Sequence, residues 1–330
     1  MKRKGFTLIE LLAVIVILAI IALIAVPVIM NIITSARKSA FEDTAYGLIS
    51  AGEMYYTNAL LNDGITGTKV FTFTEGGNVP EGLNVKGDMP KSGVLEVTKD
   101  GKTALAITNG SLCIIKGYND SKLQVLEEFE ACELPPKTLS ELAKTNDFAT
   151  TVNACATSGT CAVGTKFAIE VAPGNIQNFY VINDENNTVT LMMNSNIGDK
   201  IQWVTQADYE LAGGNPSDWG TDGNNTKGPI TALNYLEEQT AEWTNIVEKD
   251  YTLNDFSLTR TNAKARLITE TEARTISFWY TLNISTSEVF WTSAFIDAEK
   301  TATNAMFISG LGMTGITQSF GVRPVIEISK

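Results

Sequence analysis

The side chains that could carry out chemistry are limited in this chain of 330 residues. The sequence contains no histidine, which excludes Ser-His-Asp and Cys-His catalysis and any histidine-ligated zinc site. Asp and Glu are abundant, so hydrolysis by a pair of carboxylates stays formally open, but no spacing singles out a pair. We therefore expect a protein that is not an enzyme, with no catalytic residue, no metal site and no cofactor.

One carboxylate stands out by its position. Glu10 lies at the start of an apolar run that extends from Leu11 to Met30. A run of this length can cross a bilayer, which requires about 20 apolar residues. Placing an ionised carboxylate at the start of such a run in the membrane costs free energy, so the carboxylate needs a cationic or hydrogen-bonding partner. Glu10 is therefore the first candidate functional residue.

The residues around Glu10 form a recognisable motif, Lys2-Arg3-Lys4-Gly5 followed by Phe6-Thr7-Leu8-Ile9-Glu10. Residues 1 to 35 resemble the N-terminus of type IV prepilins and the related pseudopilins. The resemblance implies that a prepilin peptidase cuts between Gly5 and Phe6 and then methylates the new amine of Phe6. It also implies that Glu10 pairs with the Phe6 amine of a neighbouring subunit, which would set the register between subunits.

Two plainer interpretations of the segment explain less. A secretory signal peptide has an apolar region of about 7–15 residues and a small-residue cleavage site. Here the run is longer and has Pro27 near its end. A simple membrane anchor explains the length but neither Glu10 nor the Gly5-Phe6 junction. Pro27 predicts a kink, since proline lacks an N–H and clashes with the preceding turn, and the resemblance adds that this region loosens when the helix moves from bilayer to filament.

Charge predicts the orientation of the span. Lys2, Arg3 and Lys4 precede it, and cytoplasmic flanks are enriched in basic residues. The N-terminus is thus expected inside, with everything beyond about residue 31 outside. The chain would be a single-pass protein of the cytoplasmic membrane before assembly, and extracellular on a pilus or the cell surface afterwards.

The predicted fold class is α+β. Small and apolar residues recur at spacings of three and four after the apolar run, which is typical of one face of a helix. These residues are Ala36, Ala40, Thr44, Leu48, Ala51, Tyr55 and Ala59. The pattern predicts one continuous helix from Phe6 to Leu61, about 84 Å long. Three strands, at 93–97, 104–107 and 112–115, are separated by Asp-Gly and Asn-Gly turns and predict an antiparallel meander. A long helix packed on a small antiparallel sheet resembles the pilin head.

Leu134-Pro135-Pro136 suggests a domain boundary, because consecutive prolines favour extended chain. The expected organisation is a leader peptide at 1–5, a transmembrane and assembly helix at 6–30, a pilin-like domain at 31–133, a linker at 134–150 and a C-terminal mixed α+β domain at 151–330. In the last of these we expect strands near 167–171, 179–182, 188–192, 289–291 and 322–328, a helix at 230–247, and a second helix capped by Thr269 and Glu272.

The four cysteines are expected outside the membrane, where disulfides are stable. Their spacing favours two local bridges, Cys113–Cys132 and Cys155–Cys161, although four cysteines allow three pairings. A four-thiolate zinc site and free thiols are the alternatives.

Two patches of the C-terminal domain, Ala265 to Glu272 and Gly321 to Val325, weakly resemble C-type-lectin-like domains of bacterial surface proteins and of the formylglycine-generating-enzyme superfamily. No cysteine follows Cys161, so the cysteine-based oxidase chemistry of that superfamily is not supported. Arg266 and Arg323 within the patches are expected to be structural.

All five tryptophans fall in this region, and core packing is the expected role for most of them. Trp219, in the polar loop 218–225, is the candidate for an exposed ligand-binding side chain. That loop is rich in oxygen ligands, but it lacks EF-hand spacing.

The net charge of −12 becomes −15 when Lys2, Arg3 and Lys4 are removed, which argues against direct nucleic-acid binding. The sequence predicts a type IV pilin-like structural subunit, minor or tip-displayed, whose C-terminal module serves adhesion or subunit contacts. Its expected partners are the prepilin peptidase, other pilin subunits, the pilus assembly platform and a surface glycan or protein. The alternatives are a pseudopilin of a type II secretion or DNA-uptake system, and a membrane-anchored surface enzyme acting on polysaccharide.

Overall fold

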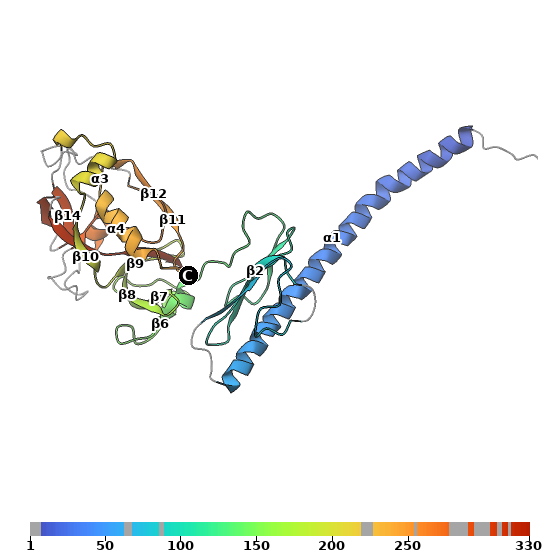
Figure 1. Cartoon of the computed structure of the whole chain (residues 1–330), viewed down its shortest axis with the longest axis horizontal. Coiled ribbons are helices and arrows are strands. Elements are labelled where there is room, and N and C mark those ends of the chain that lie inside the picture. The colour runs from blue at the N-terminus through green and yellow to red at the C-terminus, as the bar shows by residue number, and fades with distance from the viewer. Residues whose placement is uncertain are drawn as a thin grey trace, which may run out of the picture. The chain divides into compact units, whose positions relative to one another are not determined.

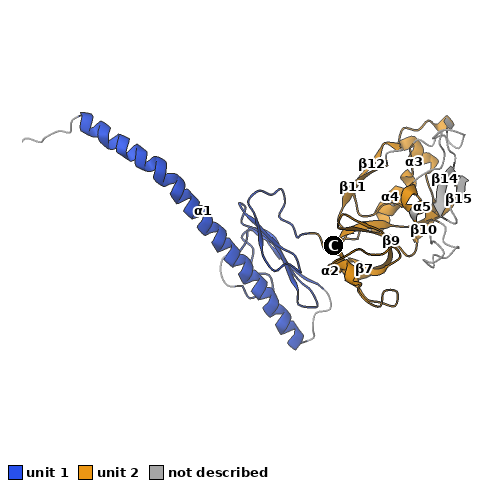
Figure 2. Cartoon of the chain, turned by 180° about the vertical axis from the view of Figure 1, so that it is seen from behind, with its two compact units in different colours: residues 1–135 blue, residues 136–330 orange. Residues whose placement is uncertain are grey.

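The chain divides into two compact units, Met1–Pro135 and Pro136–Lys330 (Figure 2). The computed structural model describes residues 8–62, 68–85, 89–218, 227–253, 256–276, 290–293, 304–308, 312–315 and 318–330. The division falls between the two prolines that predicted a boundary. The architecture is α+β throughout, as expected from the sequence.

The first unit is built on one long helix, α1 (Leu8–Leu61), whose N-terminal half extends beyond the sheet (Figure 1). The helix ends at the residue expected from the sequence. It continues through Pro27, so the missing N–H removes one ladder hydrogen bond without dividing the helix.

An antiparallel sheet packs against the second half of α1. Its described strands follow chain order: β1 (Lys69–Phe73), β2 (Ser92–Val97), β3 (Thr103–Thr108), β4 (Cys113–Lys116) and β5 (Gln124–Leu126). Strands β2 to β4 are the predicted meander, with Leu95 opposite Leu105 and Ile107 opposite Ile114. The flanking strands β1 and β5 were not predicted.

The core of the first unit lies between α1 and this sheet. Sequence spacing predicted the buried face only in part, because Leu48 and Ala51 are buried whereas Ala36 and Ala40 are exposed. The true face begins at Phe41, where the helix first meets the sheet. The buried helix side chains are Phe41, Ala45, Leu48, Ile49 and Ala51. They share one core with residues outside the helix, namely Phe71, Phe73, Leu95, Val97, Leu105, Ile107 and Ile114.

At Gly52 the helix packs closely against the sheet. A Cβ atom at this position would lie 3.1 Å from Cγ2 of Val97 and 3.2 Å from Cδ2 of Leu95. Both neighbours are packed in the core, so any larger side chain forces helix and sheet apart. The glycine weakens the isolated helix but permits the close packing of the folded unit.

We expect Gly52→Leu to destabilise the first unit by about 1–3 kcal/mol, as overpacked cores do. Gly47→Ala is the matched control, because Gly47 is exposed on the same helix; it should be stabilising by up to about 1 kcal/mol. Hydrogen–deuterium exchange of peptides covering residues 41–61 measures both. Equal exchange in the two variants would contradict the close packing at Gly52.

The second unit contains an antiparallel sheet in the order β17-β9-β8-β7-β6. These strands are β6 (Ala143–Lys144), β7 (Lys166–Ala172), β8 (Asn175–Glu185), β9 (Thr188–Met193) and β17 (Val325–Ser329). Residues 134–150 were expected to be a linker, and part of this range forms α2 (Leu139–Leu142) and the edge strand β6. Leu139 and Leu142 are buried in the core of this unit, which explains why the segment folds with it.

A second sheet has the order β10-β16-β13-β14-β15 within the described residues. Its strands are β10 (Ile197–Gln202), β13 (Phe290–Trp291), β14 (Asn304–Ile308), β15 (Gly312–Gly315) and β16 (Ser319–Val322). Strands β11 (Lys249–Leu253) and β12 (Leu258–Ala263) form a separate antiparallel pair. The remaining elements are α3 (Gln206–Leu211), α4 (Ile230–Thr240), α5 (Glu270–Thr275), η1 (Ala154–Ala156) and η2 (Pro216–Asp218).

Helix α4 is shorter than predicted. It ends at Thr240 rather than Val247, and the chain then turns so that the buried Trp243 meets Phe179 edge-on, with ring centroids 6.1 Å apart. The predicted helix near Thr269 is α5, and its capping box is formed as expected by Thr269 and Glu272.

Candidate assembly site and the second unit

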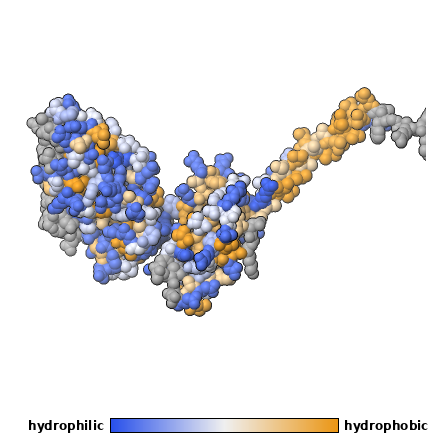
Figure 3. Space-filling model, viewed as in Figure 1, coloured by the Kyte–Doolittle hydropathy of each residue, from blue (hydrophilic) through white to orange (hydrophobic). Residues whose placement is uncertain are grey.

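The N-terminal half of α1 presents an exposed apolar surface. In Figure 3 this half is hydrophobic along its visible length, and hydrophilic surface appears where α1 reaches the sheet. Leu8 is 84% and Leu23 78% exposed. By length and composition this helix could cross a membrane, and none of its most apolar stretch is buried. An apolar surface of this size requires a partner, either lipid or other helices.

Glu10 lies in the first turn of this exposed helix, where a negative charge also suits the helix dipole. It is two residues beyond the start of the described helix. The proposed processing residues Gly5 and Phe6 lie outside the described residues. In the mature chain that the motif predicts, Glu10 would be the fifth residue.

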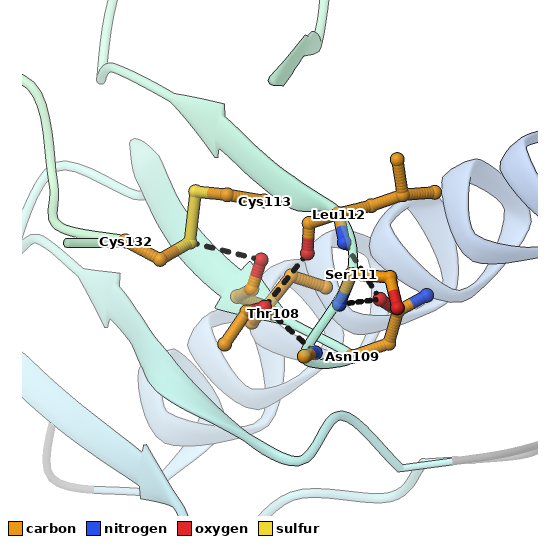
Figure 4. The surroundings of a disulfide bond; sticks show 8 residues. Thr108, Asn109, Ser111, Leu112, Cys113 and Cys132 are labelled. Carbon is orange, nitrogen blue, oxygen red and sulfur yellow. Dashed lines mark hydrogen bonds between the residues drawn. A yellow bond between two sulfur atoms is a disulfide. The ribbon is translucent and has the colours of Figure 1, made fainter. Parts of the chain in front are cut away.

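The turn between β3 and β4 lies beside α1 (Figure 4). The side-chain oxygen of Asn109 accepts hydrogen bonds from the backbone N–H groups of Ser111 and Leu112, at 3.0 and 2.9 Å. The Thr108 hydroxyl donates to the Leu112 carbonyl at 2.7 Å. These bonds explain why Asn-Gly predicted the turn correctly, since asparagine caps its own turn. These bonds fix the conformation of the turn.

Both predicted disulfides are present, Cys113–Cys132 and Cys155–Cys161. The first joins β4 to the chain that follows β5, and Cys132 Sγ lies 3.1 Å from the Ile107 carbonyl oxygen (Figure 4). In the second, the Cys161 N–H donates to Asp184. Asp184 also forms an ion pair of 2.6 Å with Lys330, and both side chains are more than nine-tenths buried. The small disulfide loop is thus tied to the main sheet.

Loss of the first bridge should cost more than loss of the second. In the chain-entropy model a sequence separation of 19 corresponds to about 3 kcal/mol and one of 6 to about 2 kcal/mol. We expect the paired Cys113→Ser, Cys132→Ser variant to lose correspondingly more stability than the Cys155→Ser, Cys161→Ser variant. Denaturation by guanidinium, followed by circular dichroism, tests this order. The reverse order would show that the native contacts of the smaller loop dominate.

The two sequence patches of the second unit, Ala265 to Glu272 and Gly321 to Val325, lie next to each other in the structure. Arg266 and Val325 exchange backbone hydrogen bonds of 2.9 and 2.8 Å. The Arg266 guanidinium donates to both carboxylate oxygens of Glu272, at 2.6 and 2.8 Å, and to Glu327 at 3.0 Å. Glu272 in turn caps α5 through Thr269. This cluster, Arg266, Glu272 and Glu327, joins α5 to strand β17, so the expected structural role of Arg266 is supported.

Arg323 is fully buried in the second unit. Its guanidinium carbon lies 4.3 Å from the centroid of the Phe290 ring, and its Nε donates to the Asn196 side chain at 3.1 Å. A buried guanidinium stacked on an aromatic ring holds its surroundings in place. Arg323 therefore contributes to the packing of the core.

Three of the five tryptophans belong to the core, as expected. Trp203 donates to the Thr292 carbonyl at 2.9 Å, Trp291 to the Ile201 carbonyl at 2.8 Å, and Trp243 is 2% exposed. Trp219, the candidate ligand-binding residue, lies outside the described residues, as does Trp279. Among the described residues, no group of three or more His, Cys, Asp or Glu side chains could hold a metal ion.

The ion cluster predicts a pH dependence. Burial by itself raises the pKa of Glu272, but the bonds and charge of Arg266 and the Thr269 bonds outweigh it, so this pKa lies below its usual 4.5. For Glu327, burial is outweighed in the same way by Arg266 and Lys249. Depressed carboxyl pKa values add stability that is present above the unfolded-state pKa and lost as pH falls through the folded one. We expect the unfolding midpoint of the second unit to stay constant near neutral pH and to decrease when the pH is lowered beyond about 4.5. A midpoint that rises on acidification would contradict this.

Comparison with known proteins supports the interpretation of the N-terminus. The model of the prokaryotic N-terminal methylation motif matches residues 1–26. No curated protein and no solved structure matches the chain. The motif supports a type IV pilin-like or pseudopilin protein, with processing by a prepilin peptidase and assembly with other pilins. The C-type-lectin-like resemblance of the second unit is not confirmed.

Proposed function

We propose that this protein is a structural subunit of a type IV pilus-like filament. The observation that carries the proposal is the combination of the methylation motif at residues 1–26 with an exposed apolar helix directly behind it. The N-terminus lies inside the cell before assembly, because the basic residues precede the span. After cleavage between Gly5 and Phe6, the pilus assembly platform inserts the subunit, and α1 packs with the helices of neighbouring subunits.

The second unit is proposed to be a module displayed on the filament. It has its own core, which includes Phe167, Phe179, Trp203, Leu236 and Trp291, and this supports its folding as a separate body. The first unit already has its own helix and sheet, so a second folded unit attached to it favours a minor or tip subunit. Its role is adhesion to a surface glycan or protein, or contact with other subunits, rather than catalysis.

Mass spectrometry of the N-terminus provides the first test. Co-expressed with a prepilin peptidase, the protein should lose residues 1–5 and carry an N-methyl group on Phe6. Full-length chain under these conditions would overturn the proposal. Immunogold labelling of residues 136–330 on cells then separates the finer alternatives. Label at filament tips supports a tip subunit, whereas label confined to the envelope without filaments supports a pseudopilin.

The displayed role needs a binding measurement. Filaments that contain the wild-type chain should bind one or more components of a glycan and matrix-protein array, and filaments assembled from a chain ending at Pro135 should not. Equal binding by both filaments would restrict the second unit to contacts between subunits. Release of sugars from the array would instead support the enzyme alternative.

A further inference from the structure

The chain leaves the first unit through a short segment that a disulfide ties to the middle of the sheet. Strand β5 ends at Leu126, and the unit ends at Pro135. Between these two points lies Cys132, which is bonded to Cys113, the first residue of β4. Strand β4 is an interior strand, because β3 and β5 pair with it on either side. Shortly before the second unit begins, the chain is therefore attached covalently to the interior of the sheet.

The attachment point on β4 lies beside α1. Leu112, which precedes Cys113, packs against the core cluster that contains Phe41 of α1. The β3–β4 turn and the helix around Phe41 line one groove (Figure 4). Asn109 fixes the conformation of this turn through the N–H groups of Ser111 and Leu112. A force applied to Cys113 is thus transmitted to α1 through the packing of the core.

The last part of the segment between the two cysteines is attached less strongly. It includes β5, an edge strand of three residues that pairs only with β4 within the described residues. An ion pair of 3.0 Å joins Glu127 to Lys38 of α1, but both side chains are in contact with solvent, and such pairs contribute little to stability. Segments with few buried contacts open at a lower free energy than the core does. Without the bridge, a force on the chain after Cys132 would therefore act on this segment first.

We propose that the Cys113–Cys132 bridge is a mechanical bypass, which transmits tension between α1 and the second unit past residues 114–131. The inference rests on the proposed function, in which α1 is held in a filament while the second unit binds a surface. Tension then enters the first unit at Pro135, crosses from Cys132 to Cys113 and reaches α1 through the core. With the bridge closed, the first unit lengthens only when its core opens. With the bridge open, the segment around β5 is pulled away at a lower force.

Optical tweezers applied to the full-length protein in detergent micelles test the proposal. Azide-bearing residues at the exposed positions Ala36 and Glu133 hold the two DNA handles, so the second unit stays outside the tether. For the paired Cys113→Ser, Cys132→Ser variant we expect an early step, in which residues 117–131 are released and the tether lengthens by up to about 50 Å. The wild type should show no step at that force.

Three controls separate the bypass from a general loss of stability. Dithiothreitol, added to a wild-type molecule that is already folded and tethered, reduces the bridge to two thiols and becomes a cyclic disulfide itself. The early step should then appear in that same molecule. Lys38→Gln removes the ion pair with Glu127 and should lower the force of the first step only when the bridge is open. The paired Cys155→Ser, Cys161→Ser variant lacks the bridge of the second unit and should match the wild type.

A first step at the same force in the bridged and unbridged proteins would overturn the inference. A lower first force in Lys38→Gln with the bridge closed would overturn it as well, because the tension would then run through residues 114–131. Absence of the wild-type protein from sheared filaments would count instead against the proposed function. The tether measurement does not depend on filaments, so the two failures are distinguishable.

Discussion

Replacement of Glu10 by alanine should leave the protein in the membrane but reduce its incorporation into filaments by about ten-fold or more. Removal of one partner of a buried ion pair leaves the other charge uncompensated, which costs several kcal/mol. In the filament that charge would be the Phe6 amine of a neighbouring subunit. We expect membrane insertion to depend on the apolar run from Leu11 to Met30, which the change does not alter. Sheared filaments and membrane fractions, quantified by immunoblot, measure the two effects separately.

Two variants sharpen the test of Glu10. Glu10→Gln keeps the size and hydrogen-bonding capacity of the side chain, so a similar defect would assign the effect to its charge. Glu53→Ala removes an exposed carboxylate from the same helix, well past its apolar run, and should assemble normally. Normal filament yield from Glu10→Ala would show that the carboxylate is dispensable for assembly. Loss of the protein from membranes would show that Glu10 acts at insertion instead.

The sequence predicted those elements whose signals are local. The end of α1 at Leu61, the turn at Asn109, the capping box at Thr269 and the disulfides all follow from residues close together in the chain. The edge strand β5 was missed because it has only three residues, and β1 was missed because its buried Phe71 and Phe73 need the rest of the sheet to bury them.

Other features depend on contacts that a single sequence does not reveal. The buried face of α1 differs from the predicted one because it is set by where the sheet begins, at Phe41. The pairing of Arg266 with Glu327 joins residues 61 positions apart. The sequence indicated both patches, but only the fold shows that Arg266 pairs with Val325 through the backbone and shares an ion cluster with Glu327.

Replacement of Arg266 by methionine should destabilise the second unit by about 3–5 kcal/mol, because two partly buried carboxylates lose their shared cation. Arg274→Met is the matched control. It removes an arginine from α5 whose ion pair with Glu270 is largely exposed, and exposed pairs contribute less than about 1 kcal/mol. All five tryptophans lie in the second unit, so their fluorescence during urea unfolding reports on this unit alone. Equal loss in the two variants would contradict the role of the cluster.

The same variant should also reverse the response to acid. With Arg266 present, the pKa values of Glu272 and Glu327 lie below their usual range, and stability falls as the pH drops below about 4.5. Without Arg266, burial raises both pKa values, opposed only by the Thr269 bonds to Glu272 and by Lys249 beside Glu327, and we expect burial to prevail. Protonation then favours the folded state, so the variant should gain stability as the pH falls from about 6 to about 4. A parallel pH profile in both proteins would show that Arg266 stabilises the unit by packing, independently of its charge.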